Sequence, residues 1–288
     1  MNRPDVKAFF DEATYTFSYV AWDPQKRQAA VIDSVLDYDA ASGRIRHDAA
    51  DAIIAFIAAQ SLTVQWIIDT HVHADHLSAA PYVKSRLGGT LAIGEHICAI
   101  QQTFGDLFNV EPTFRRDGSQ FDHLFKDGER YRLGDIDAVA LHTPGHTPAC
   151  MTHVIGDAAF VGDTLFMPDY GTARCDFPGG DARTLYRSIQ RIFSLPGNTR
   201  IFLCHDYKAP GRDAYAHETT VDAEREANIH VRHGTDEDAF VQMRESRDAT
   251  LAVPRLLLPS VQVNMRGGQL PEAEGNGVSY LKIPLNAF

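Results

Sequence analysis

The sequence predicts a layered α/β protein built around one large domain. Two observations carry this prediction. Segments with strand patterns and segments with helix patterns are intermixed along the chain. Clusters of ligand-type polar residues also stand directly after apolar strands, where layered α/β proteins place their active sites. The composition agrees, because 288 residues with 44% hydrophobic and 23% charged side chains are typical of a globular protein.

The elements follow from local patterns. Two strands surround the turn Asp23 to Lys26, an Ala-rich helix covers 47–60, and a buried strand covers 63–69. Further elements are predicted in this order: a helix at 77–87, a strand at 90–94, a helix near 96–107, strands at 137–143 and 151–162, the latter interrupted by a turn at 156–157, a helix at 182–195, a strand at 199–204, and helices at 217–231 and 236–247.

The last 40 residues contain several Pro and Gly residues and show no clear periodicity, which predicts an irregular tail. We therefore expect a catalytic domain over 1–250 and a tail over 251–288 that packs on the same domain.

Composition and charge exclude some classes of function. A net charge of -11 disfavours nucleic acid as a partner, because such a surface repels phosphate backbones. No apolar stretch reaches about 18 residues, so no membrane span is expected. The first residues resemble neither a secretory signal nor a transit peptide, and the four cysteines have no metal-type spacing. These features predict a cytoplasmic protein.

The stretch THVHADH contains four potential metal ligands. His71 and His73 are two apart on a chain that leaves a strand, so both imidazoles can point the same way. Asp75 and His76 lie a step further, at the expected start of a helix. This spacing is specific and predicts a metal-binding loop.

Three other segments also place a ligand-type residue after an apolar strand. They are HTPGHTP with His146, VGDTLF with Asp163, and LCHDY with His205. A single histidine at a strand end is usually just part of the polar surface, whereas four segments that end alike predict one metal centre. The residues themselves leave open whether that centre holds one ion or two.

This set resembles the metallo-β-lactamase superfamily, which implies a four-layer αββα sandwich. In two-metal members such as glyoxalase II, the first metal is bound by residues matching His71, His73 and His146. The second is bound by residues matching Asp75, His76 and His205, and the carboxylate matching Asp163 bridges the two. All seven residues are present in this chain.

Other segments narrow the resemblance to the persulfide dioxygenases, over about residues 14 to 270. The most specific are Arg-x-Asp-Phe at 174–177 and Asn-Met-Arg at 264–266. The chain departs from the usual family pattern in two places, since Cys175 replaces a threonine and Gly267 replaces a cysteine that often follows the tail arginine. With an insertion around 208–216 and a longer tail, these departures suggest a bacterial subtype.

The resemblance implies one Fe(II) per chain, bound by residues matching His71, His146 and Asp163. Two imidazoles and one carboxylate form a facial triad that leaves coordination positions open. The four remaining candidates would then orient ligands by hydrogen bonding or form a vacant second metal site; these are His73, Asp75, His76 and His205.

The resemblance also implies the reaction. The outer sulfur of glutathione persulfide would be oxidised by O₂ to sulfite, and glutathione would be released. Tyr207 is a candidate to contact the substrate, and Arg174, Arg225 and Arg266 are candidates to bind its carboxylates. An ion pair of Arg174 with Asp176 is the equally good structural interpretation. Homodimers are common in the resembled family.

Two other functions stay open. A thiolester hydrolase of the glyoxalase II type (hydroxyacylglutathione hydrolase) would use two zinc ions and a bridging hydroxide. A non-catalytic sulfane-sulfur carrier or sensor would use Cys175, which could also be a small buried hydrophobic residue.

Overall fold

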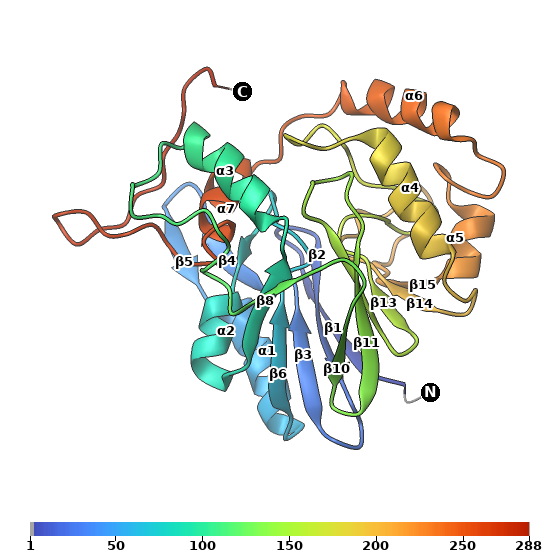
Figure 1. The fold of residues 1–288 in the computed structure, drawn as a ribbon, viewed down its shortest axis with the longest axis horizontal. Coiled ribbons are helices and arrows are strands. Elements are labelled where there is room, and N and C mark those ends of the chain that lie inside the picture. Colours follow the sequence, from blue (N-terminus) through green and yellow to red (C-terminus); the bar gives the residue numbers. More distant parts are fainter. Residues whose placement is uncertain (1–2, 288) are drawn as a thin grey trace.

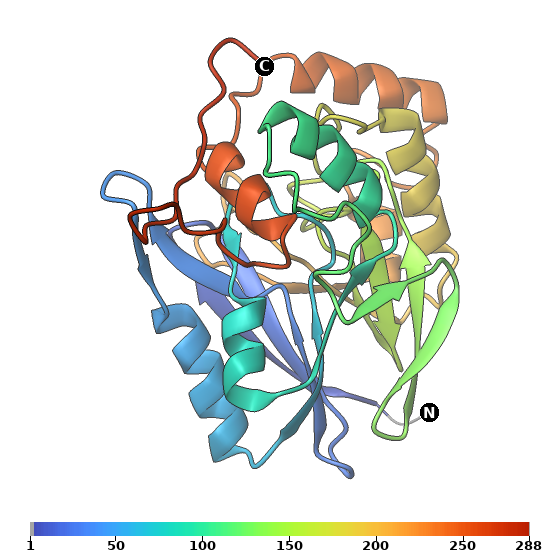
Figure 2. The ribbon, with the colours of Figure 1, turned by 60° about the vertical axis from the view of Figure 1, so that its left-hand side comes forward.

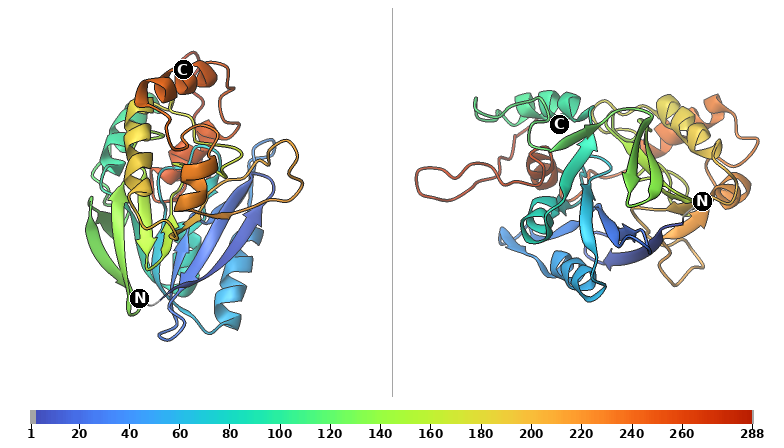
Figure 3. Two further views of the ribbon diagram at one scale, coloured as in Figure 1. Left: turned by 90° about the vertical axis from the view of Figure 1, so that its right-hand side faces the viewer. Right: turned by 60° about the horizontal axis from the view of Figure 1, so that its bottom comes forward.

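A computed structural model describes residues 3–287 and shows four layers (Figure 1). Two six-stranded sheets face each other, and helices cover the outer face of each sheet (Figures 2 and 3). The predicted αββα sandwich is therefore confirmed. No helix within the described residues is long and apolar enough to cross a membrane.

The first sheet has the strand order β1-β2-β3-β6-β8-β9. Its strands are β1 (Asp5–Asp11), β2 (Thr16–Trp22), β3 (Gln28–Ile32), β6 (Thr63–Ile68), β8 (Thr90–Gly94) and β9 (His123–Phe125). Four helices lie on this side of the molecule: α1 (Asp48–Ala59), α2 (Ala80–Leu87), α3 (Ile97–Leu107) and α7 (Leu257–Asn264). A small sheet of β5 (Arg44–Arg46), β4 (Val35–Asp39) and β7 (Leu77–Ser78) adjoins them.

The second sheet has the strand order β10-β11-β12-β13-β14-β15. Its strands are β10 (Glu129–Leu133), β11 (Ile136–His142), β12 (Met151–Ile155), β13 (Ala158–Phe160), β14 (Arg200–Phe202) and β15 (Glu218–Thr220). Helices α4 (Ala182–Phe193), α5 (Val221–Ala227) and α6 (Glu237–Asp248) cover it.

Side-chain alternation along the strands builds the layers, because successive residues of a strand face opposite sides of its sheet. In β2, Val20 joins the core beneath the helices, whereas Tyr19 and Ala21 join the core between the sheets. A third core lies between the second sheet and α4 to α6. Both faces of the central strands are buried, which explains why they read as nearly continuous apolar runs.

The structure corrects the sequence-based elements at several points. The tail is not irregular throughout, because Leu257–Asn264 forms helix α7, and Val261, Val263 and Met265 join the first core. The helix predicted at 217–231 is strand β15 followed by the shorter helix α5. The sequence analysis also missed several strands, namely β1, β4, β5, β9 and β10, and the short β7 inside the predicted helix at 77–87.

The topology brings the ligand-type segments to one edge of the sandwich. Strands β3 and β6 are parallel, as are β13 and β14, so their carboxyl ends point the same way. His71 follows β6, His146 follows β11, Asp163 follows β13 and His205 follows β14. Carboxyl ends of such strands are the usual place for a ligand site.

Candidate metal centre

The loop after β6 is held by one buried aspartate. Asp33 accepts hydrogen bonds from the Thr70 backbone N–H at 2.7 Å and from the Thr70 hydroxyl at 3.0 Å. Asp33 itself has φ +53°, a left-handed conformation that is costly for a residue with a side chain. Conformations of this kind persist where surrounding contacts enforce them, and here the carboxylate anchors the ligand loop.

The same contacts fix the orientation of two imidazoles. His73 donates from Nε2 to Asp33 at 2.9 Å, which leaves its Nδ1 without a protein partner. His71 contacts the Thr70 hydroxyl through Nδ1 at 3.1 Å, which leaves its Nε2 free. A histidine that ligates a metal characteristically uses its second ring nitrogen in this way, because the hydrogen bond selects the tautomer.

His146 is presented by a tight turn at Pro144 and Gly145. Gly145 has φ +135°, and a Cβ atom there would lie 2.4 Å from the Leu185 backbone, so no other residue fits. His146 donates from Nδ1 to the Arg174 carbonyl at 2.8 Å. Its Nε2 is 3.6 Å from Asp163 Oδ2.

His205 joins the two sheets at the site. The backbone N–H of Phe17 donates to the Cys204 carbonyl at 2.7 Å, and His205 donates from Nδ1 to the Tyr15 carbonyl at 3.2 Å. His205 Nε2 lies 3.2 Å from both Asp75 Oδ2 and Asp163 Oδ1.

All seven predicted ligand residues therefore meet in one cluster. Most are fully buried, yet several of their polar atoms form no hydrogen bond among the described residues. His71 Nε2, His73 Nδ1 and His76 Nε2 have no partner, and His205 Nε2, Asp75 Oδ2 and Asp163 Oδ1 have only the 3.2 Å contacts with one another. Unpaired buried polar atoms are costly. A cluster of imidazole nitrogens and carboxylate oxygens with free lone pairs fits a divalent metal, so the residues present suit such an ion.

The electrostatics of the cluster also suit a cation. Burial alone would raise the pKa of Asp163, but the nearby charge of His205 outweighs burial and holds that pKa well below its usual range. Burial lowers the pKa of His71, which keeps the imidazole neutral and able to bind a metal. The site therefore presents an ionised carboxylate beside a neutral imidazole.

The geometry contains more than one group of possible ligands. Ligand atoms of His71, His146 and Asp163 lie within 4.8 Å of one another, as the facial-triad prediction requires. A second group of the same compactness combines His73, Asp75 and His76. The arrangement thus supports metal binding.

A cavity of about 370 Å³ opens onto the cluster. Its lining includes Asp75, His146 and Asp163 together with four aromatic residues, Tyr15, Phe166, Tyr170 and Tyr207. Tyr207 is 38% exposed and its ring lies parallel to that of His205, with 5.7 Å between centroids. The size and mixed lining suit a small organic substrate.

The four residues predicted to bind substrate fall into two groups. Tyr207 and Arg174 line this cavity, but Arg174 also pairs with Asp176, as the structural interpretation predicted. Arg225 lines a different cavity and bonds to the Phe193 carbonyl. Arg266 is buried and pairs with Glu111. Neither Arg225 nor Arg266 is among the residues that line the cavity at the cluster, so we do not assign them to substrate binding.

Sequence reasoning missed Asn264 as part of the site. Its side-chain amide donates to the His73 and His76 carbonyls, each at 2.8 Å, and its Oδ1 accepts from the Ser78 N–H at 2.8 Å. One side chain of α7 thus holds the backbone of the ligand loop. The Asn-Met-Arg motif was the available signal, but it could not reveal these partners.

Cys175 is buried among apolar residues of the third core, and its backbone N–H donates to Asp248 at 2.8 Å. Burial raises the pKa of its thiol. These surroundings support a small hydrophobic residue over a reactive thiol.

A four-layer sandwich with a histidine and carboxylate cluster at the carboxyl ends of its strands defines a class of metal-dependent enzymes. Comparison with known families assigns the chain within that class. A family model described as "Metallo-beta-lactamase superfamily" matches residues 12–205, so the chain belongs to the metallo-beta-lactamase superfamily.

Individual relatives carry different names. The chain is 59% identical to a "Probable metallo-hydrolase" of Burkholderia pseudomallei, covering 98% of this chain and 99% of that protein. It is 46% identical to "Glyoxylase B2" of Dictyostelium discoideum, covering 99% and 98%. It is 30% identical to the mitochondrial persulfide dioxygenase ETHE1 of Homo sapiens, covering 93% and 91%.

Among solved structures, ETHE1 from Myxococcus xanthus superposes with a TM-score of 0.72 at 28% identity, covering 92% of this chain and 100% of that one. The match extends beyond the superfamily model and includes most of the chain. It agrees with the resemblance to persulfide dioxygenases that the sequence motifs indicated.

Proposed function

We propose that the protein is a glutathione-dependent persulfide dioxygenase with one Fe(II) held by His71, His146 and Asp163. One observation favours this activity over the other activities of the superfamily. The Asn-Met-Arg element, which resembles the dioxygenases, is built into the metal centre, because Asn264 holds the backbone of His73 and His76. The structural similarity to ETHE1 from Myxococcus xanthus adds support.

In the proposed reaction, glutathione persulfide, O₂ and water give glutathione, sulfite and two protons. The terminal sulfur is oxidised, both atoms of O₂ are reduced, and the sulfur–sulfur bond breaks. An iron held by His71, His146 and Asp163 would supply the redox chemistry between the terminal sulfur and O₂.

The chain's own residues have three tasks. Asp33 and the Arg174 carbonyl orient His73 and His146 through hydrogen bonds. The aromatic walls of the cavity limit access of water to the cluster. The hydroxyl of Tyr207, two residues after His205, donates a hydrogen bond to the bound substrate.

Metal analysis and oxygen uptake test the proposal together. Protein purified without oxygen should contain about one iron per chain and little zinc. Glutathione persulfide should cause oxygen uptake and sulfite formation in comparable amounts, whereas glutathione alone should cause none because it has no outer sulfur. A flat oxygen trace on an iron-loaded sample would contradict the proposal.

A thiolester hydrolase of the glyoxalase II type is the second candidate. Two observations favour it: Asp75, His76 and His205 retain free ligand atoms beside Asp163, and "Glyoxylase B2" is more similar to the chain than the human dioxygenase is. Two zinc ions per chain and rapid hydrolysis of S-lactoylglutathione would establish this function instead.

A further inference from the structure

Four arginines line the cavity at the metal centre, and they differ in their partners. Arg174 pairs with Asp176 and donates to the Ala252 carbonyl. Arg244 is buried, pairs with Asp248 at 2.7 Å and donates to the Thr172 carbonyl at 3.0 Å. Both guanidinium groups therefore already have hydrogen-bond and ion-pair partners within the protein.

The other two, Arg247 and Arg255, are exposed. Arg247 is in the last turn of α6, and Arg255 is on the segment that joins α6 to α7. Neither side chain forms an ion pair within 4.0 Å or a hydrogen bond with any residue between 3 and 287. Their charges are available to a ligand.

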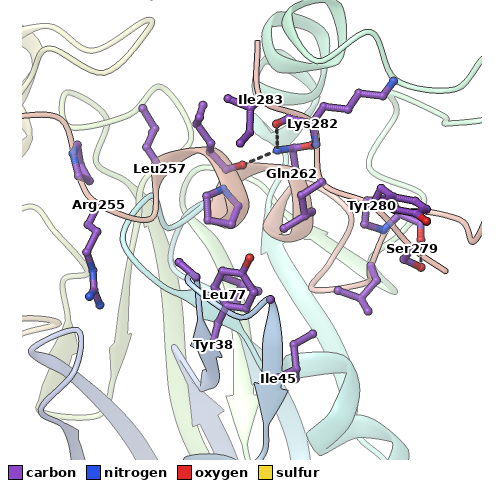
Figure 4. A pocket seen from close by; sticks show the side chains of 18 of the residues that line it. Tyr38, Ile45, Leu77, Arg255, Leu257, Gln262, Ser279, Tyr280, Lys282 and Ile283 are labelled. Carbon is purple, nitrogen blue, oxygen red and sulfur yellow. Dashed lines mark hydrogen bonds between the residues drawn. The ribbon is translucent and has the colours of Figure 1, made fainter. Parts of the chain in front are cut away.

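Arg255 lines other cavities besides the one at the metal centre. It also borders a larger groove of about 740 Å³ between β4 and the tail. Figure 4 shows its guanidinium group turned away from Gln262 and Tyr280, which line another part of that groove. Arg255 also lines a small cavity that contains Asp11, Asp37 and Asp39, but none of these described carboxylates is within ion-pair distance of Arg255.

The charge of the cavity lining points to an anionic ligand. Among residues 3–287, its only acidic lining residues are Asp75 and Asp163, which belong to the ligand-type cluster. In a chain of net charge -11, two unpaired cations beside such a cavity attract anions locally. A guanidinium group binds a carboxylate with two parallel hydrogen bonds, so these arginines suit carboxylates better than neutral groups.

We propose that Arg247 and Arg255 bind the carboxylates of the substrate's non-reacting part and so select a thiol-derived substrate with two carboxylates. The inference rests on the proposed function for the identity of that substrate, glutathione. The residues that select the substrate would then lie outside the Arg-x-Asp-Phe and Asn-Met-Arg motifs.

Binding of S-methylglutathione, a thioether that cannot react, tests the inference without depending on catalysis. Calorimetry on the metal-loaded protein should show that Arg247→Ala and Arg255→Ala each weaken binding by roughly 10-fold, as expected for a hydrogen bond to a charged group. The double variant should bind more weakly still. S-methylcysteine, with one carboxylate, should bind weakly to every variant.

Arg232→Ala is the matched control, because Arg232 is also exposed, lines a different cavity and has no side-chain partner among the described residues. It should bind S-methylglutathione like the unmodified protein. Equal binding by the double variant, or no binding by the unmodified protein, would overturn the inference. Activity assays on the unmodified protein separate the two proposals. If that protein hydrolyses S-lactoylglutathione without oxygen uptake and the double variant loses S-methylglutathione binding, the arginine assignment is retained and the dioxygenase is rejected.

Discussion

Two buried carboxylates of this protein have opposite surroundings. Asp163 lies among His205, His71 and His146, which hold its pKa well below the usual range despite burial. Glu224 in α5 is fully buried, and its carboxylate accepts one hydrogen bond from the described residues, from the Asn228 amide at 2.6 Å; burial raises its pKa to about 8. Asp163 is therefore ionised, whereas Glu224 is a neutral acid near pH 7.

The difference shows that burial alone does not make a metal site. Both carboxylates have an oxygen without a hydrogen-bond partner among the described residues. Only Asp163 lies among imidazoles that favour its charged form and that can bind a metal once they lose a proton. A cation can therefore compensate the buried charge at Asp163, while protonation compensates it at Glu224.

Of the matched carboxylate-to-amide substitutions at the two sites, the one at Asp163 should have the larger effect on activity. Asp163→Asn keeps the shape but removes the charge, so we expect iron loss and a fall in oxygen uptake of more than about 100-fold, beyond the 10–100-fold typical of supporting residues. Iron content and uptake should be measured on the same sample. Retention of one iron per chain with normal uptake would show that Asp163 is not a ligand.

Histidine substitutions should show which neighbours bind the metal. His146→Ala should lose iron like Asp163→Asn, because it removes one of three proposed ligands. His205→Ala and His76→Ala should keep most of the iron and lower activity by roughly 10–100-fold, as supporting residues do. If His205→Ala loses iron as completely as His146→Ala, the division of the ligand set is wrong.

Glu224→Gln should change stability with pH and leave iron content unchanged. The folded pKa of Glu224, about 8, is above the unfolded value of about 4.3, so its contribution to stability is complete below pH 4.3 and is lost as pH rises through 8. The loss is at most about 1.4 kcal/mol per pH unit in that window. Glutamine removes this titration, so the variant should unfold at higher denaturant concentration than the unmodified protein at pH 8.5. Equal midpoints at that pH would contradict a neutral Glu224.

Tyr207→Phe should have the smallest effect, because Tyr207 lies at the exposed edge of the cluster and its ring packing survives the change. Loss of one hydrogen bond of about 0.5–1.5 kcal/mol should raise KM by roughly 2–10-fold with little change in kcat. Steady-state uptake at several persulfide concentrations would measure both. A large fall in kcat with unchanged KM would place the hydroxyl at the reacting sulfur instead.

The sequence by itself determined the α/β class, most of the central strands and the seven ligand-type residues. These features are local, because alternation predicts a buried strand and short spacings such as THVHADH place side chains on one loop. Short or exposed strands such as β5 and β9 were missed because they contain only a few residues and little periodicity.

Only the tertiary structure decided which polar residues serve the site. Asn264 reaches a loop about 190 residues earlier in the chain, and Arg225 and Arg266, which looked equivalent to other arginines in sequence, have partners elsewhere. Arg247 and Arg255 belong to no motif, yet they border the cavity and have no acidic partner in the described part of the chain. The physical reason is that spacing along the chain fixes direction within one element, whereas hydrogen-bond and ion-pair partners depend on how distant elements pack.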